Sequence, residues 1–250
     1  MNKYPLVEAI FELRWGERSP GRFNFSKEDT DIFYQKFAMQ ASLHNFIVVE
    51  TPNLDAPPIP HLVKYRYRTQ EDTWPCYQTG LGLFTVNQIQ DGYNRNQFLS
   101  DIEAGMKIWI NSLSGHLEKV TETLTVSLRY QNAFYKNKEL DVINKIEKTL
   151  GIKIIFPEKY SDNLGNLNAL NMNFGISCKS PMKSTAQISI SDAVIEGKLG
   201  LFIDTAVESK LIDIIDIHNS SDIIKSKMSE WLNEAYIFQK SNYEMLMKHS

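Results

Sequence analysis

Apolar and polar residues alternate with a period of two through much of the chain, which predicts a protein rich in β-strands. Residues 5–15 follow this pattern strictly, with Val7 and Phe11 on the apolar side and Glu8 and Glu12 on the other. Such alternation is typical of a strand with one buried face. Further strands are expected over residues 61–69, 74–79, 81–90, 123–134, 174–179, 184–195 and 198–207.

Apolar residues at helical spacing predict helices between these strands. Ser26 is followed by acidic residues and is expected to cap the first helix. Other helices are predicted over residues 98–117, over residues 138–150 with Gly151 at the C′ position, and from Ser221 or Asp222 to about Met247.

The predicted elements repeat in one order, which is strand, helix, three or four strands, helix. Gly82-Leu83-Phe84-Thr85 and Gly200-Leu201-Phe202-Ile203 open matching strands, and Trp109 and Trp231 lie in the helices that follow. We expect an internal duplication with halves over residues 1–120 and 121–250 of one compact unit, the second having an extended C-terminal helix. Chance recurrence of Gly-Leu-Phe is the alternative.

This order predicts an α+β fold built from a duplicated β-α-β-β-β-α unit. Its strands would form one curved antiparallel sheet with the helices on one face. The element order is similar to that of TATA-binding-protein-like folds, and this similarity concerns architecture and not function. The opposite face of such a sheet stays open, so we expect polar strand residues to gather there.

Composition and charge limit the classes of function. The chain has 250 residues, of which 42% are hydrophobic and 23% charged, and its formal net charge is −3. This balance gives no overall attraction to phosphate or anionic lipid. No run is apolar enough to span a membrane, and Cys76 and Cys178 lack metal-ligand spacing. We expect a cytoplasmic protein without a metal or cofactor.

Candidate ligand-binding residues lie on the polar sides of three predicted strands. They are Glu8, Glu12, Arg14, Lys64, Arg66, Arg68, Arg129 and Gln131. A ladder of ion pairs on the open face is one interpretation. Binding of nucleic acid or nucleotide through the arginines is another. An enzyme of unfamiliar type around Glu8 and Glu12 is a third, although their carboxylates would be about 13 Å apart along the strand. No catalytic motif is recognised.

The C-terminal helix carries more apolar surface than one sheet face needs. Its candidate partner-binding residues are Tyr236, Phe238, Tyr243, Met245 and Leu246. Aromatic residues and methionine are enriched at protein–protein interfaces, so this surface suggests a protein partner or a second copy of the chain. Packing of the same residues on the sheet is the alternative.

Two motifs give the chain a resemblance to a known family. Residues 5–15 read PLVEAIFELRW, and Leu128-Arg129-Tyr130-Gln131-Asn132 lies near the middle of the chain. The pair resembles a sporadically distributed family of uncharacterised bacterial proteins with a Pro-Leu-x-Glu-Ala strand and a Leu-Arg-Tyr-x-Asn strand. Ser127 and Gln131 stand where the family pattern has glycine and isoleucine.

The resemblance covers nearly the whole chain and implies no established activity. The family's patchy occurrence implies mobile genetic neighbourhoods, where antiviral defence modules are common. Together with the absence of a catalytic motif, this predicts a non-enzymatic binding or adaptor subunit. Its protein partner would be encoded by a neighbouring gene, within a bacterial defence module. A nucleic-acid sensor is the alternative function.

Overall fold

The computed structural model describes residues 6–52, 57–113, 117–135, 147, 151–153, 155, 171–195, 198–214 and 221–247. Most of the helix predicted over residues 138–150 therefore lies outside the described residues. At its expected end, Gly151 has a φ of 65° and its backbone N–H donates to the carbonyl oxygen of Glu147. This is the geometry predicted for a C′ glycine.

Helices separate runs of strands, as the sequence pattern predicts. The strands are β1 (Leu6–Arg14), β2 (Glu17–Ser19), β3 (Arg22–Phe23), β4 (Val48–Glu50), β5 (Val63–Arg68), β6 (Cys76–Gly80), β7 (Leu83–Ile89), β8 (Thr125–Tyr135), β9 (Asn171–Ser177), β10 (Thr185–Ile195) and β11 (Lys198–Lys210). The helices are α1 (Lys27–Leu43), α2 (Arg95–Ser112), α3 (Leu117–Thr121), α6 (Leu211–Ile214) and α7 (Ser221–Met247). The hairpin of β2 and β3 and the short elements β4, α3 and α6 were not predicted.

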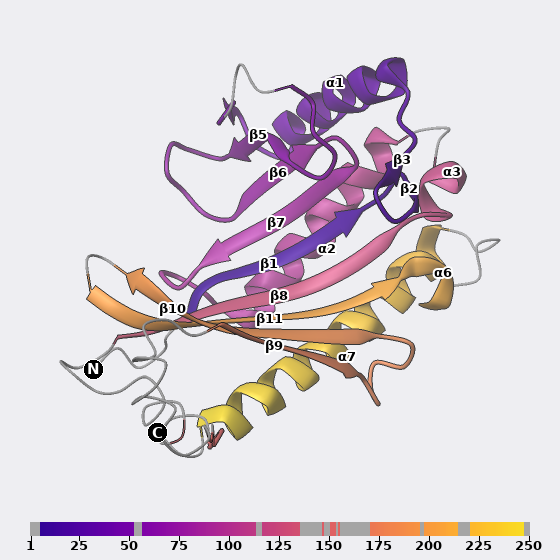
Figure 1. Ribbon diagram of the computed structural model, residues 1–250. Helices are drawn as coiled ribbons and strands as arrows, with labels where there is room; N and C mark the ends of the chain where they lie inside the picture. The colour runs from indigo at the N-terminus through magenta and orange to yellow at the C-terminus, as the bar shows by residue number, and fades with distance from the viewer. Residues whose placement is uncertain are drawn as a thin grey trace.

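One antiparallel sheet of nine strands organises the chain (Figure 1). Its order is β4-β5-β6-β7-β1-β8-β11-β10-β9. The N-terminal strand β1 lies near the middle and pairs with β7 on one side and β8 on the other. On one side of the centre, β1 is followed outward by β7, β6 and β5. On the other side, β8 is followed outward by β11, β10 and β9. The mixed α+β class with a large antiparallel sheet is thus confirmed.

Helices α1, α2 and α7 pack on one face of the sheet, which we call the helix face. Phe37 of α1, Trp109 of α2 and Trp231 of α7 belong to one buried core together with Phe11 and Leu128 of the sheet. In Figure 1, α2 passes behind β7 and β1. Ser26 caps α1 as predicted, because its hydroxyl accepts a hydrogen bond from the backbone N–H of Asp29. The face opposite these helices is called the open face.

Gly105 permits a close approach of α2 to the sheet. A Cβ atom at Gly105 of α2 would lie 2.9 Å from Cζ of Phe84 and 3.1 Å from Cγ2 of Val86. Such separations are shorter than carbon atoms adopt without a shift. The absence of a side chain at Gly105 therefore lets α2 lie directly on β7.

The two Gly-Leu-Phe segments occupy different local positions. Gly82 precedes β7 in a turn with a φ of 69°, and a Cβ atom there would lie 2.4 Å from the Trp15 carbonyl oxygen. Gly200 lies within β11 instead. Leu83 and Phe84 are both buried in the first segment, with Phe84 against Phe37 of α1, whereas Leu201 is buried and Phe202 partly exposed in the second. These segments do not superpose residue by residue, so this recurrence is not evidence for duplication.

Candidate functional site on the open face

Most of the predicted ligand-binding residues come together on the open face. Strand pairing places Glu8 beside Gln131, and Glu12 beside Ser127, across β1 and β8. Arg129 of β8 lies opposite Ile10 of β1, and Asp204 of β11 lies opposite Gln131. Because side chains alternate between the faces of a strand, this register brings Glu8, Glu12, Arg14, Arg129 and Gln131 to one surface.

A groove of about 450 Å³ crosses the first half of this face. We call it the open-face groove. Glu8 and Glu12 of β1 line one side of it, and Arg66 and Arg68 of β5 line the other. Its remaining described lining is His61, Leu62, Val63, Trp74, Gln78, Leu83, Thr85 and Asn87, with Ile10 of β1. Three strand spacings separate β1 from β5, so the acidic and basic sides are about 14 Å apart.

Lys64 lies away from the groove, in contrast to its predicted place. The pairing of β5 with β6 shifts register between Val63 and Tyr65, which is the mark of a β-bulge. The bulge changes which residue faces each way, so Val63 lines the groove. Nζ of Lys64 instead lies 5.6 Å from the ring centre of Tyr34 on α1. Its placement on the open face was therefore wrong.

Arg129 is held by a carboxylate that the sequence did not single out. Its Nε donates to Oδ1 of Asp204 at 2.7 Å and to Oδ2 at 3.0 Å, and its Nη2 also contacts Oδ2. Hydrogen bonding to Asp204 is the main cause that raises the pKa of Arg129, and the charges of Asp204, Glu12 and Glu8 add to it. The guanidinium is thus already matched within the sheet.

Arg14 and Arg68 are paired in the same way. Nε of Arg14 lies 2.8 Å from Oε1 of Glu12, and its Nη2 contacts Glu208 of β11. Nε of Arg68 lies 3.0 Å from Oε1 of Glu50. Ion pairs therefore connect the strands of the open face, and their acidic members are Glu12, Glu50, Asp204 and Glu208.

Arg68 also holds the edge of the groove in place. Its Nη1 donates to the carbonyl oxygen of Thr73 at 2.6 Å, and its guanidinium carbon lies 4.6 Å from the ring centre of Trp74. Only 5% of Arg68 is exposed. The Nε atoms of Arg66 and Arg68 are both buried without a hydrogen bond, but Arg68 is ion-paired and buried, whereas Arg66 is partly exposed. Of the two arginines on this side, Arg66 is the better placed to bind a ligand.

Neutral polar groups form the floor of the groove. Nδ2 of Asn87 donates to Oε1 of Glu8 at 2.7 Å, and the hydroxyl of Thr85 donates to Oδ1 of Asn87. Glu8 thus has the donor that a covered carboxylate requires. The site residues predicted from the sequence do not include Gln78, Thr85 or Asn87. Polar residues alternate through the β7 sequence LFTVNQI and could have indicated the last two.

Cys76 lies beside this polar floor and provides a test of its packing. Its cross-strand neighbour is Asn87, it is fully buried, and burial raises the pKa of its thiol to about 11. At pH 8 about one such thiol in a thousand is ionised, and the thiolate is the reactive form. We expect iodoacetamide at pH 8 to label the partly exposed Cys178 in the folded protein and Cys76 only after denaturation. Peptide mass spectrometry measures both, and equal labelling of the two would contradict the structure.

The predicted partner-binding residues of α7 whose side chains are described, Tyr236, Phe238 and Tyr243, contact the rest of the protein. The ring of Tyr236 lies 6.5 Å from that of Tyr130 on β8, and the Arg95 guanidinium lies 4.1 Å from its centre. Phe238 packs against the core, and Tyr243 lines a cavity beside the sheet. The side chains of Met245 and Leu246 lie outside the described residues. The alternative interpretation, packing on the sheet, fits Tyr236 and Phe238.

The described residues contain no cluster of three or more His, Cys, Asp or Glu side chains that could hold a metal ion. None of the described helices has the length and apolar character that crossing a membrane requires. Comparison with protein-family models, curated proteins and solved structures finds no match. Functional inference therefore rests on the geometry of the site.

Proposed function

We propose that the chain is a non-enzymatic binding subunit whose open face accepts a protein partner. The pairing of Arg14, Arg68 and Arg129 with carboxylates on that same face is the observation that carries this proposal. Acidic and basic groups alternate across strands about 5 Å apart. A protein surface of mixed charge complements such a pattern, and electrostatic complementarity gives interfaces their specificity.

The same pairing disfavours the nucleic-acid alternative. A polyanion is bound by cations that replace its counterions, and affinity follows the number of phosphates they neutralise. Arg129 and Arg14 already share their charge with Asp204 and Glu208, and Glu8 and Glu12 add negative charge beside them. We therefore expect weak binding of single-stranded DNA even at low salt.

Co-expression with the products of adjacent genes tests the proposal. We expect a complex in size-exclusion chromatography with light scattering for the unmodified chain. Gln131→Trp places a large side chain on the open face and should abolish the complex. Lys107→Trp, on the exposed side of α2, is the matched control and should leave it intact. Retention of the complex by Gln131→Trp, or a chain that forms no complex with any of these products, would refute the proposal.

A bacterial antiviral defence module is the setting that we propose for this activity. The resemblance of residues 5–15 and 128–132 to the patchily distributed family supports it. We also propose a cytoplasmic location, which the free thiols of Cys76 and Cys178 support, because cysteines stay reduced there. Phage-infection assays with and without Gln131→Trp would link the open face to this role.

We further propose that the two half-sheets descend from one duplicated unit with the element order of TATA-binding-protein-like folds. Support comes from the strand order, since β1, β7, β6 and β5 have counterparts in β8, β11, β10 and β9. Each series is followed by a long helix, α2 or α7, with a buried tryptophan. The open face would then be shared by both halves.

A further inference from the structure

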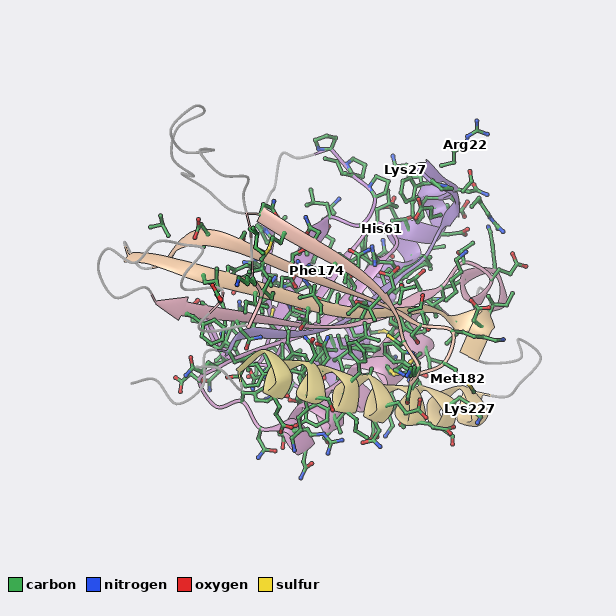
Figure 2. All side chains as sticks on the ribbon, turned by 60° about the horizontal axis from the view of Figure 1, so that its bottom comes forward. Arg22, Lys27, His61, Phe174, Met182 and Lys227 are labelled. Carbon is green, nitrogen blue, oxygen red and sulfur yellow. The ribbon has the colours of Figure 1, made fainter. Side chains whose placement is uncertain are left out.

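A second concave site lies on the helix face, on the other side of the sheet from the open-face groove. It is a cavity of about 470 Å³ between α7, the loop before α2 and strands β1, β8 and β11. Figure 2 shows α7 running along one side of the sheet with side chains between the two. The volume falls within the range of small-molecule sites, about 300–1,000 Å³.

Aromatic rings form much of the cavity lining. Tyr130 of β8 meets Tyr93 edge to face at 6.2 Å and Tyr236 of α7 at 6.5 Å. The hydroxyl oxygens of Tyr93 and Tyr130 are 2.9 Å apart and hydrogen-bonded. Burial raises the pKa of both phenols, so they stay neutral at physiological pH. Such rings offer flat, uncharged surfaces on which a planar ligand can stack.

Side-chain amides supply the polar part of the lining. Asn132 of β8 and Asn242 of α7 are each 8% exposed, and Gln239 of α7 is 5% exposed. Nε2 of Gln239 donates to the carbonyl oxygens of Leu128 and Thr205, both at 3.0 Å, which fixes the orientation of this amide. Its Oε1 is buried and accepts no hydrogen bond. A buried acceptor in this state is unusual, and a donor from a ligand or water would satisfy it.

The charge of the lining favours a neutral ligand. Among the described residues that line the cavity, the cation is Lys240 and the anion is Glu244. They lie one helical turn apart on α7, with Nζ 3.8 Å from Oε1. Their charges offset one another. The guanidinium of Arg95, outside this lining, is engaged with the ring of Tyr236 and donates to Oδ1 of Asn233, so the described lining itself offers a phosphate or an ammonium group no unmatched opposite charge.

We propose that this cavity binds a neutral nucleobase or nucleoside. Amide side chains read the donor and acceptor edges of bases, and aromatic side chains stack on their planes. A cavity lined by tyrosines and by Asn132, Gln239 and Asn242 provides both kinds of contact. The described lining of this site shares no residue with that of the open-face groove, so the inference is independent of the proposed function.

Titration calorimetry and saturation-transfer NMR with adenosine, guanosine, cytidine and uridine at millimolar concentration test the proposal. We expect at least one nucleoside to bind. Asn132→Leu, which keeps the branched shape of the side chain, should weaken that binding about 10-fold or more, because a base edge loses its hydrogen-bonding partner. Gln187→Leu also replaces a side-chain amide by leucine, at an exposed position of β10, and should leave nucleoside binding unchanged.

The corresponding nucleoside monophosphate should bind more weakly than the nucleoside, because the cavity offers its phosphate no unmatched cation. Asn242→Leu repeats the test from α7 in case Asn132→Leu does not fold, as judged by circular dichroism. Absence of binding by all four nucleosides would overturn the proposal. So would equal binding by a folded Asn132→Leu or Asn242→Leu variant, or tighter binding of the monophosphate.

Discussion

Replacing Trp109 by alanine is expected to lower the free energy of unfolding by about 3–5 kcal/mol, the range for deletion of a large buried aromatic side chain. Trp109 is 1% exposed, and its ring lies 5.8 Å from that of Trp15, which in turn packs 5.5 Å from Phe33 of α1. The substitution therefore removes the contact that joins α2, the end of β1 and α1. Urea denaturation followed by far-ultraviolet circular dichroism measures the loss.

Two variants separate packing from other effects. Lys107→Ala, on the exposed side of the same helix, should change stability by less than about 0.5 kcal/mol. Trp109→Phe should cost clearly less than the alanine variant, because it keeps a ring and removes the indole N–H, which is buried without a hydrogen-bond partner. A loss below about 1 kcal/mol in Trp109→Ala would contradict the position of Trp109 at the centre of the core.

Local alternation predicted the strands well because it reflects which side chains each strand buries. The period of two in residues 5–15 predicted β1, and the pattern in residues 61–69 predicted β5. It failed where a β-bulge changes the alternation. Bulges near Val7 and Lys64 leave Val7 41% exposed and turn Val63 toward the open-face groove. Nothing in the local pattern distinguishes a bulged from a regular pair.

Contacts between distant segments could not be predicted from the pattern. Arg14 and Glu208 are 194 residues apart, and Arg129 and Asp204 are 75 residues apart. Each pair exists because β8 lies beside β1 and β11 lies beside β8. The sequence predicted that arginines and glutamates would share a face, but their partners depend on the strand order. The cavity beside α7 was missed for the same reason, since its lining comes from distant parts of the chain.

Reversing one charge at the centre of the open face is expected to weaken partner binding strongly. Arg129→Asp should weaken it by about 2–5 kcal/mol, or about 30-fold or more, the range for loss of one member of a charge pair at an interface. It also sets two carboxylates against each other, so stability should fall by about 1–2 kcal/mol. This loss is smaller than for a buried pair, because 42% of the Arg129 side chain is exposed.

A charge swap distinguishes the two effects. Arg129→Asp combined with Asp204→Arg restores an ion pair between β8 and β11 but inverts its polarity at the surface. Stability should return toward that of the unmodified protein, while the affinity for the partner, measured by calorimetry, should stay low. If the double variant recovered both quantities, Arg129 would serve the fold alone and make no contact with a partner.

The central claim is that the open face is the surface a partner covers, and site-specific photocrosslinking tests it most directly. Benzoylphenylalanine is introduced at Gln131 and Gln187 on the open face, and at Lys107 and Ile237 on the outer sides of α2 and α7. In cells that carry the neighbouring genes, we expect a covalent adduct with the product of one of those genes from the first two positions. Adducts confined to Lys107 or Ile237 would contradict the claim.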